Sequence, residues 1–359
     1  MIIKNINHDA SYHTEKIAVM FFPLEKLKTD GDDTVVIETK KENNLLSVKV
    51  KAYSRFLEKT YELKENDDVT HSLSILLYDT LSELTGYSLP WGILYGVRPA
   101  RLMHATVEKY GVDGAVQKFL DDKVEQKKID LALSVMEREN KIIALSCDNS
   151  FSLYVSIPFC PSRCSYCSFV SHSIANAKDL IQPYVELLCR ELENIGKIAK
   201  NLGLRLESIY FGGGTPTTLS AEQLDILLTV IERNFDLSTL REYTVEAGRP
   251  DTVTEAKLNT LMSHNVERIS INPQTFSDNV LKAIGRKHTC AQTVEAYELA
   301  RKVGFKNINM DFIAGLNSDT PESFKMSIDK ALSLAKVLRY IIWHLNPPLF
   351  CAPKMNFLI

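Results

Sequence analysis

The sequence lacks an apolar stretch long enough to cross a membrane. It contains no uninterrupted apolar window of about 18 residues, whereas a spanning helix needs about 20 predominantly apolar residues. The first residues, Met1-Ile2-Ile3-Lys4-Asn5, also lack the basic stretch and long apolar core of a secretory signal peptide. We therefore expect a cytoplasmic protein without a membrane partner.

The chain also has little excess charge. Its 42 Lys and Arg residues and 45 Asp and Glu residues give a formal net charge of -3. Such a chain has no general field that attracts a polyanion, so binding of nucleic acid would need a local basic patch, and we do not expect that partner. With 45% hydrophobic and 24% charged residues over 359 positions, the composition is that of a folded protein long enough for two domains.

Cysteine is scarce and unevenly spread. There are seven cysteines, and Cys160, Cys164 and Cys167 lie within one short segment. A secreted disulfide framework has an even number of cysteines spread along a short chain, so we exclude that class. Cys189 lies in an apolar helical segment and is interpreted as a small core residue.

Residues 1–146 predict a mixed α/β domain. Two β-rich runs, at 34–39 and 45–50, flank a polar segment that is typical of the connection in a β-hairpin. Apolar residues at helical spacing predict helices at 72–85 and 127–145.

From residue 150 onward, short apolar runs alternate with longer helical stretches. This alternation is typical of repeated βα units that share one parallel sheet. Strands are predicted at 153–157, 208–211, 243–246, 268–271, 307–311 and 340–344. Helices are predicted at 182–200, 221–234, 254–263, 293–303 and 321–334. The predicted fold class is α/β, with a partial six-stranded parallel (β/α)6 barrel over 150–345 and an atypical tail at 346–359.

Residues that can carry chemistry follow the predicted strands. In a parallel sheet or barrel, the loops after the strands open onto one face, where functional groups collect. The three cysteines follow the first strand, Gly212, Gly213, Gly214 and Thr215 follow the second, Glu246 ends the third, Gln274 follows the fourth and Asp311 ends the fifth. We expect all five loops to meet at one site.

The spacing of the three cysteines predicts an iron–sulfur cluster. Cys-x3-Cys-x2-Cys can wrap a loop around one face of a cuboidal cluster, with one thiolate on each of three irons. The fourth iron would keep an open position, which a metal centre needs in order to engage a substrate. A structural zinc site with His172 as fourth ligand and a redox dithiol of Cys164 and Cys167 are the alternatives, and we favour the cluster because no second pair of ligands follows.

The other candidate residues each have a structural alternative. The triple glycine lets backbone amides approach a ligand closely, but it also suits a tight turn. Glu246 and Asp311 would be costly to bury unless a cationic or hydroxyl-rich ligand meets them, although each can also be a solvated loop acid. Arg163, inside the cysteine loop, is a candidate carboxylate partner or a structural residue.

At these residues the chain resembles the radical S-adenosylmethionine (SAM) superfamily, and within it the oxygen-independent coproporphyrinogen III oxidase family, most closely its HemZ branch. The resemblance covers about residues 150–334. It rests on Tyr-Val-Ser-Ile-Pro-Phe before the cysteine motif, on Gly-Gly-Gly-Thr-Pro-Thr at 212–217 and on Gly315-Leu316. The first 146 residues resemble that branch through Leu89-Pro90-Trp91-Gly92 and Gly96-Val97-Arg98-Pro99.

The resemblance implies two cofactors and the residues that hold them. Cys160, Cys164 and Cys167 would hold a 4Fe–4S cluster, and SAM would chelate its open iron. The residues implied to contact SAM are Tyr154, Gly213, Gly214, Thr215, Glu246, Gln274, Arg286 and Asp311.

The implied reaction converts coproporphyrinogen III to protoporphyrinogen IX in haem biosynthesis. The cluster is reduced by one electron, SAM is cleaved to methionine and a 5′-deoxyadenosyl radical, and hydrogen is abstracted from a propionate side chain. Loss of carbon dioxide and an electron then leaves a vinyl group, and the cofactors carry this chemistry while the protein orients them. The implied partners are a porphyrinogen substrate and an unidentified electron donor, and we expect a monomer.

Three departures from the family leave alternatives open. Ser168-Phe169 follows Cys167 where the well-studied branch has a further cysteine, and Asn317 stands where proline is usual. Residues 336–359 do not resemble the family, so we expect a truncated or frameshifted reading frame. The alternatives are another radical SAM reaction, such as tRNA or cofactor modification, a haem-binding chaperone, and a truncated inactive homologue that still binds cluster and SAM.

Overall fold

The computed structural model describes residues 1–29 and 33–334, together with the backbone of residues 337–342. The chain divides into two compact units, Met1–Leu145 and Ser146–Ile359. Among the described residues, no helix combines the length and apolarity needed to cross a membrane. The predicted tail at 346–359 and the last two residues of the predicted strand 340–344 lie outside the described residues.

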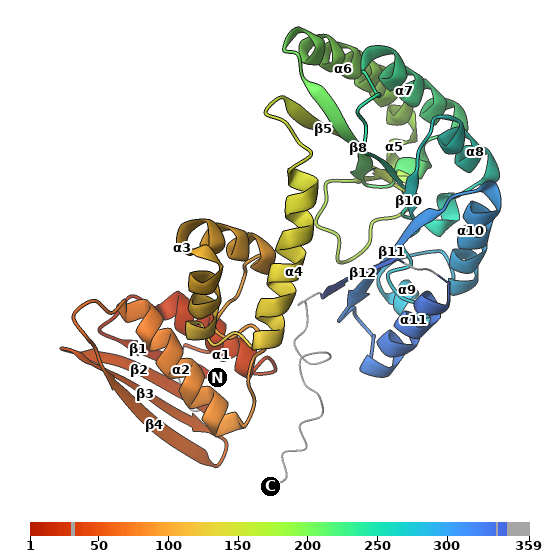
Figure 1. Ribbon diagram of the computed structural model, residues 1–359. Helices are drawn as coiled ribbons and strands as arrows, with labels where there is room; N and C mark the ends of the chain where they lie inside the picture. Colours follow the sequence, from red (N-terminus) through yellow and green to blue (C-terminus); the bar gives the residue numbers. More distant parts are fainter. Residues whose placement is uncertain (30–32, 335–336, 343–359) are drawn as a thin grey trace. The chain divides into compact units, whose positions relative to one another are not determined.

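The first unit contains a mixed sheet with helices packed on it (Figure 1). Its strands, in sheet order, are β1 (Ile2–Ile6), β2 (Val35–Glu42), β3 (Leu45–Ala52) and β4 (Arg55–Glu62). Its described helices are α1 (Ser11–Phe21), α2 (Val69–Thr85), α3 (Pro99–Asp121) and α4 (Gln126–Ile143). β1 pairs with β2 in parallel, while β2, β3 and β4 pair antiparallel, so the predicted mixed α/β character is confirmed.

One face of this small sheet is buried under α1 and α2. In β3 every second residue is apolar and buried, namely Leu46, Val48 and Val50, as expected for a strand with one face in the core. These side chains share a core with residues such as Ile17 of α1 and Leu77 of α2. The sheet is therefore held by the burial of one apolar face.

The predicted hairpin between the two β-rich runs is confirmed, but its connection is shorter than predicted. β2 continues through the polar residues Lys40, Lys41 and Glu42, and only Asn43 and Asn44 form the turn. Asn43 has a φ of 53°, in the left-handed region that asparagine tolerates in tight hairpin turns. The prediction that these polar residues belong to the loop is wrong. A strand with one solvated face also carries polar side chains, so polarity alone did not distinguish strand from loop.

The second unit is built on a six-stranded sheet in which all neighbouring strands are parallel. The strands, in sheet order, are β12 (Val337–Ile342), β11 (Asn307–Ala314), β10 (Arg268–Ser270), β9 (Glu242–Glu246), β8 (Arg205–Gly213) and β5 (Ser150–Ile157). The helices that follow them are α6 (Ile181–Asn201), α7 (Ala221–Asn234), α8 (Glu255–Ser263), α10 (Cys290–Val303) and α11 (Pro321–Leu334). The predicted partial six-stranded barrel is confirmed.

Short elements interrupt this alternation around the cysteine segment and after β10. They are β6 (Phe159–Cys160), β7 (His172–Ser173), α5 (Ile174–Ala177) and α9 (Asp278–Ala283). Figure 1 shows the long helices along the outer face of the curved sheet, while the inner face carries none of them.

The two faces of the six-stranded sheet differ sharply in polarity. The outer face carries apolar residues that are almost fully buried beneath the helices, such as Val155 of β5, Phe211 of β8 and Val245 of β9. In α6 the buried residues Val185, Leu188 and Leu192 recur at helical spacing and pack into this core. Because side chains alternate along a strand, the intervening residues face inward.

The inward-facing residues are polar. Strand register places Tyr154 beside Tyr210 and then Thr244, and it places Glu246 beside Ser270 and then Asn309. Parallel sheets in α/β proteins usually have helices on both faces. Here a polar face is left for the functional residues.

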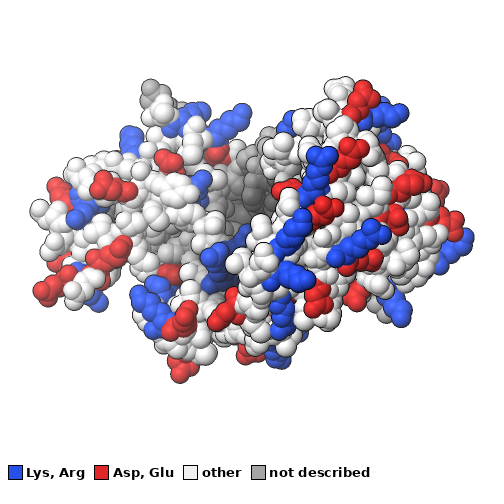
Figure 2. All heavy atoms as spheres, turned by 90° about the horizontal axis from the view of Figure 1, so that it is seen from above, with Lys and Arg blue, Asp and Glu red and all other residues white. Residues whose placement is uncertain are grey.

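Charged side chains of both signs are interspersed on the surface seen in Figure 2. This distribution accords with the small net charge of -3.

Candidate active site

The three cysteines of the predicted cluster motif lie between β5 and β7. Cys160 belongs to the short strand β6, which corrects the prediction that all three cysteines lie in a loop. Cys164 and Cys167 occupy a turn in which the Cys167 amide donates to the Cys164 carbonyl oxygen at 3.1 Å. All three thiols are free and half-buried. The segment from β6 to β7, here called the cysteine loop, thus presents three available thiols.

The cysteine loop is fastened to the segment that follows α9. The Ser165 amide donates to the Ile284 carbonyl oxygen at 3.0 Å, and the Ser162 hydroxyl donates to the Gly285 carbonyl oxygen at 2.8 Å. Gly285 has a φ of 81° and an added Cβ would lie 3.3 Å from the Arg163 carbonyl oxygen. These contacts hold the loop's backbone in place without using the thiols.

The glycine run lies against the cysteine loop, as predicted, but each glycine has a different role. A Cβ on Gly212 would lie 2.9 Å from the hydroxyl oxygen of Tyr154 and 2.9 Å from a ring carbon of Tyr210. Gly213 has a φ of 98°, which favours glycine. A Cβ on Gly214 would lie 2.7 Å from the Phe159 carbonyl oxygen and 3.0 Å from the Cys160 Sγ atom.

Thr215 continues this contact. Its amide donates to the Phe159 carbonyl oxygen at 2.8 Å, and its hydroxyl lies 3.5 Å from the Cys160 Sγ atom. Gly214 and Thr215 therefore border the first cysteine.

Tyr154 and Glu246 form a second group on the polar inner face. The ring of Tyr154 stacks on Tyr210, with centroids 5.9 Å apart and an interplanar angle of 10°. The Tyr210 hydroxyl donates to a carboxylate oxygen of Glu246. Partial burial, together with the negative charge of Glu246, raises the pKa of Tyr154, so its hydroxyl stays protonated at neutral pH. Tyr210 thus contacts both predicted residues, Tyr154 through ring stacking and Glu246 through a hydrogen bond.

Gln274 and Asp311 form a third group. Asp311 lies inside β11 rather than at its end, which corrects the prediction, because the strand continues to Ala314. The Gln274 amide donates to the Asp311 carbonyl oxygen at 3.0 Å. Gln274 has a φ of 69°, and its buried Oε1 atom has no hydrogen-bond donor among the described residues. A strained backbone that presents an unpaired acceptor is typical of a ligand-binding residue.

Arg286 connects the third group to the cysteine loop. Its Nη1 atom donates to the Asn272 carbonyl oxygen at 2.5 Å, and the side-chain oxygen of Asn272 accepts from the Asp311 amide at 3.3 Å. Its Nη2 atom donates to the Tyr166 hydroxyl at 3.2 Å, and both Arg286 and Tyr166 contact Cys164. The buried Nε atom of Arg286 has no acceptor within the described part of the chain, so it is available to a ligand.

Sequence reasoning missed four residues of this region: Tyr166, Tyr210, Arg249 and Asn272. Tyr210 could have been found, because strand register places it beside Tyr154 on the same face. Asn272 and Arg249 lie in irregular loops after β10 and β9, where no periodic pattern indicates which way a side chain points.

The residues present fit an iron–sulfur cluster better than a single metal ion. Within the described ranges, no three His, Cys, Asp or Glu side chains are grouped so that they could hold one ion. A zinc ion draws its thiolates to about 2.3 Å from one centre, whereas a four-iron cluster binds each thiolate through a different iron and keeps them farther apart. His172 pairs by backbone with Phe159 but does not complete a zinc site.

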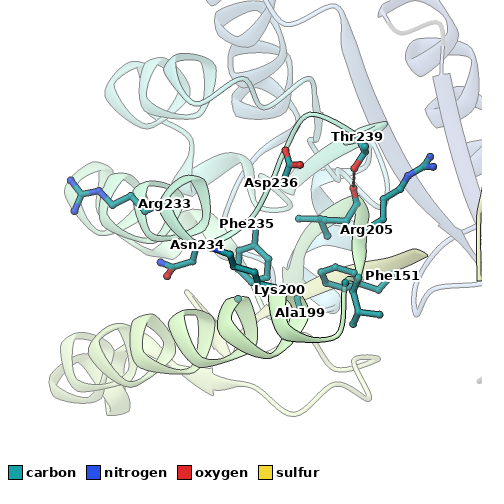
Figure 3. Close-up of a pocket in the computed structure, with 13 residues that line it drawn as sticks. Phe151, Ala199, Lys200, Arg205, Arg233, Asn234, Phe235, Asp236 and Thr239 are labelled. Carbon is teal, nitrogen blue, oxygen red and sulfur yellow. Dashed lines mark hydrogen bonds between the residues drawn. The ribbon is translucent and has the colours of Figure 1, made fainter. Parts of the chain in front are cut away.

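A pocket of about 660 Å³ lies at the other end of the second unit's sheet (Figure 3). It is lined by the ends of α6 and α7 and by the beginning of β8, including Lys200, Phe235 and Leu206. β8 runs from this pocket to the glycine run, and its nine residues span about 26 Å. Functional loops of such sheets follow the carboxyl ends of the strands, so we do not assign the active site to this pocket.

Residues 154–331 match the family model described as the radical SAM superfamily. The chain belongs to this superfamily. It is 34% identical over 333 residues to the oxygen-independent coproporphyrinogen-III oxidase-like protein HemZ of Bacillus subtilis. The matched region covers 91% of this chain and 65% of that protein.

Other similarities cover about half of the chain. The chain is 40% identical over 183 residues to the heme chaperone HemW of Lactococcus lactis, covering 51% of this chain and 46% of that protein. The structure of coproporphyrinogen III oxidase HemN from Escherichia coli matches with a TM-score of 0.49 and 25% identity, covering 56% of this chain and 46% of that one. The chain thus spans about two thirds of HemZ and about half of the other two proteins.

Proposed function

We propose that this chain is a radical SAM enzyme that oxidatively decarboxylates the propionate groups of coproporphyrinogen III to vinyl groups without oxygen. The cofactor part is carried by the placement of Gly214 against Cys160, since only a residue without a Cβ atom can pack this closely against a free thiol of the cysteine loop. The substrate part is supported by the similarity to HemZ, which extends through both units.

In this proposal Cys160, Cys164 and Cys167 hold a 4Fe–4S cluster. When bound, the cluster and SAM supply one-electron radical chemistry that amino-acid side chains cannot perform, with an external protein or small molecule as the electron donor. Gly214 and Thr215 border Cys160, and a Cβ atom on residue 214 would clash with the backbone beside this ligand, while Gly213 precedes them with a positive φ.

The chain's own residues bind and orient the cosubstrate. The unpaired Oε1 atom of Gln274 accepts a hydrogen bond from a cationic or hydroxyl-bearing ligand, and the Nε atom of Arg286 donates one to a carboxylate. Glu246, Tyr154 and Asp311 add acceptors and a flat aromatic surface on the polar inner face of the sheet. SAM has an ammonium, a carboxylate, ribose hydroxyls and an adenine ring, so it matches this set.

A haem chaperone is the second candidate function. It is favoured by the 40% identity of about half of this chain to HemW of Lactococcus lactis. The similarity to HemW covers 51% of the chain, whereas the similarity to HemZ covers 91%. We therefore prefer the proposed oxidase function.

Anaerobic reconstitution of the full chain with iron and sulfide tests the proposal. Formation of a vinyl-bearing porphyrin from coproporphyrinogen III, with release of 5′-deoxyadenosine, is the expected result. Release of 5′-deoxyadenosine without porphyrin product would contradict the substrate assignment. Haem binding without SAM cleavage would support the chaperone instead.

Single cysteine variants test the cluster assignment. Cys160→Ala, Cys164→Ala and Cys167→Ala should each lose most of the bound iron, because each removes a ligand. Cys189→Ala is the matched control: Cys189 packs against the core from α6, outside the cysteine loop, so its removal should leave the iron content unchanged. Equal iron loss in Cys189→Ala would contradict the assignment.

A further inference from the structure

Arg249 is a buried guanidinium outside the set of predicted site residues. It lies three residues after the end of β9, and only 3% of its surface is exposed. A buried charge is costly unless ionic and hydrogen-bonding partners surround it. Asp251 supplies one set of partners, with its carboxylate oxygens 3.2 Å from Nε and 3.4 Å from Nη2 of Arg249.

The remaining donors of Arg249 face the cysteine loop. Nη1 donates to the Ser162 carbonyl oxygen at 3.2 Å, and Nη2 donates to the Ser162 hydroxyl at 3.2 Å. Nη1 also lies 3.8 Å from the Sγ atom of Cys164, within the range of an N–H···S hydrogen bond. One side chain therefore fastens the loop and directs a charged donor at a thiol.

Positive charge is concentrated at Cys164. Arg286 contacts the same thiol and also donates to the hydroxyl of Tyr166 in the loop. Thr215, by contrast, offers a neutral hydroxyl to Cys160. The surroundings of the cysteines are therefore unequal.

The other titratable groups at Arg249 do not cancel this charge. Asp251 neutralises part of it through the ion pair. His288 lies 3.9 Å from Asp251. Burial, followed by the charges of Arg286 and Arg249, lowers the pKa of His288 to about 3, so the imidazole is neutral at physiological pH. Asp278 also faces His288, but it accepts from the Cys290 amide rather than from Arg249. The two guanidinium groups at Cys164 are therefore paired with one carboxylate, Asp251, and leave a net positive charge beside the loop.

We propose that Arg249 raises the reduction potential of the cluster by placing a buried positive charge and an N–H donor at Cys164. This inference rests on the proposed function, because it requires the three cysteines to hold the cluster. Net charge and hydrogen bonds to the ligand sulfurs set the potentials of such clusters. Reduction adds one negative charge, which a nearby buried cation stabilises. Arg249 is thus a positioning residue that tunes the cofactor without touching the substrate.

The test is an anaerobic redox titration of the reconstituted full chain, followed by electron paramagnetic resonance. Arg249→Gln removes the charge but keeps hydrogen-bond donors, and Arg249→Lys keeps the charge. Arg163→Gln is the matched control, because Arg163 is exposed in the same loop and its charge is screened by solvent.

Arg249→Gln should lower the equilibrium constant for reduction about tenfold, a shift of about 59 mV for a one-electron couple. Arg249→Lys should retain a potential closer to that of the wild type, and Arg163→Gln should leave it unchanged. Equal potentials in all four proteins, or equal shifts in both Arg249 variants, would overturn the inference, since the second result indicates only a loop anchor. Failure of the wild type to bind a cluster would overturn the proposed function as well.

Discussion

Gly214 lies so close to Cys160 that a Cβ atom on residue 214 would stand 3.0 Å from the cysteine Sγ atom. The same atom would lie 2.7 Å from the Phe159 carbonyl oxygen and 2.9 Å from the Ile157 carbonyl oxygen. Two of these three neighbours are backbone atoms of β5 and β6, which cannot move without disturbing the cysteine loop. The glycine at this position is therefore required by the geometry of the first cysteine.

The first prediction is that Gly214→Ala prevents cluster assembly. The added methyl group pushes the Phe159 carbonyl group and the Cys160 thiol away from residue 214. Overpacking of this kind costs about 1–3 kcal/mol. We expect the iron content after anaerobic reconstitution to fall well below half that of the wild type, with the helical circular dichroism signal retained.

Gly248→Ala provides a matched control for this prediction. Gly248 lies in the loop after β9, and its added Cβ would meet only the Asn272 side chain, at 3.4 Å, which is ordinary contact. This variant should bind iron like the wild type. An equal iron content in Gly214→Ala and the wild type would show that Gly214 is not needed at the cluster.

The second prediction is that Gln274→Met does not lower the stability of the fold but weakens ligand binding. Gln274→Met removes a buried oxygen that lacks a hydrogen-bond donor among the described residues, and leaving such an atom unpaired costs about 1–3 kcal/mol. Methionine has a similar length. We expect the free energy of unfolding of the cofactor-free chain to stay equal or rise, while SAM affinity falls about tenfold, as for loss of one hydrogen bond to a charged group.

Urea denaturation and calorimetric titration with SAM measure these two quantities. Asn272→Ala is a useful comparison, because Asn272 supplies a structural hydrogen bond to the Asp311 amide and its removal should lower stability. Loss of stability in Gln274→Met with unchanged SAM affinity would assign Gln274 a structural role.

The alternation of strands and helices in the second unit could be predicted because local patterns specify it. The predicted helix at 221–234 coincides with α7, whose start is marked by Ser220 and Gln223 in a reciprocal capping box. By contrast, β1 and β4 of the first unit were not predicted. In β4 charged and polar residues alternate with half-buried ones, and its strand structure depends on pairing with β3.

The candidate site could be predicted only where its residues follow strands in a recognisable motif. The cysteine motif and the glycine run belong to this class, and the structure places them together. Arg249 does not, because its contact with Cys164 arises from two loops that are 85 residues apart in sequence. No periodicity of the chain encodes such a contact.

The third prediction is that Glu207 stabilises the amino end of the second unit's sheet. Its carboxylate is buried, lies 2.9 Å from Arg205, is paired with Arg241 and accepts the Ser150 hydroxyl at 2.7 Å. Removing one partner of a buried ion pair costs about 3 kcal/mol or more, so we expect Glu207→Ala to lower the free energy of unfolding by about 3 kcal/mol.

Glu242→Ala is the matched control for Glu207→Ala. Glu242 pairs with Arg268 at 3.1 Å, but its side chain is 46% exposed, and exposed pairs contribute about 0.2–1 kcal/mol. Urea denaturation followed by circular dichroism measures both variants. Equal losses in the two variants would mean that burial of Glu207 does not strengthen its ion pairs.

The last prediction concerns His264, whose ring bridges α8 to two carboxylates of α7. Its Nδ1 atom lies 2.8 Å from Glu232 and its Nε2 atom lies 2.9 Å from Asp225. Burial alone lowers the pKa of His264, but the hydrogen bonds and charges of the two carboxylates outweigh it, so the pKa is raised above the ordinary value of 6.5. The folded protein therefore binds a proton more tightly at this residue than the unfolded chain does.

A raised folded-state pKa gives a stabilising contribution that is fully present below about pH 6.5 and is lost as pH rises through the folded-state value. Urea denaturation at a series of pH values should show the free energy of unfolding falling over that window in the wild type. His264→Gln keeps hydrogen-bonding capacity but cannot be protonated, so its profile should be flatter there, and the two proteins should differ most at low pH. Parallel profiles across the window would rule out the imidazolium as the stabilising species.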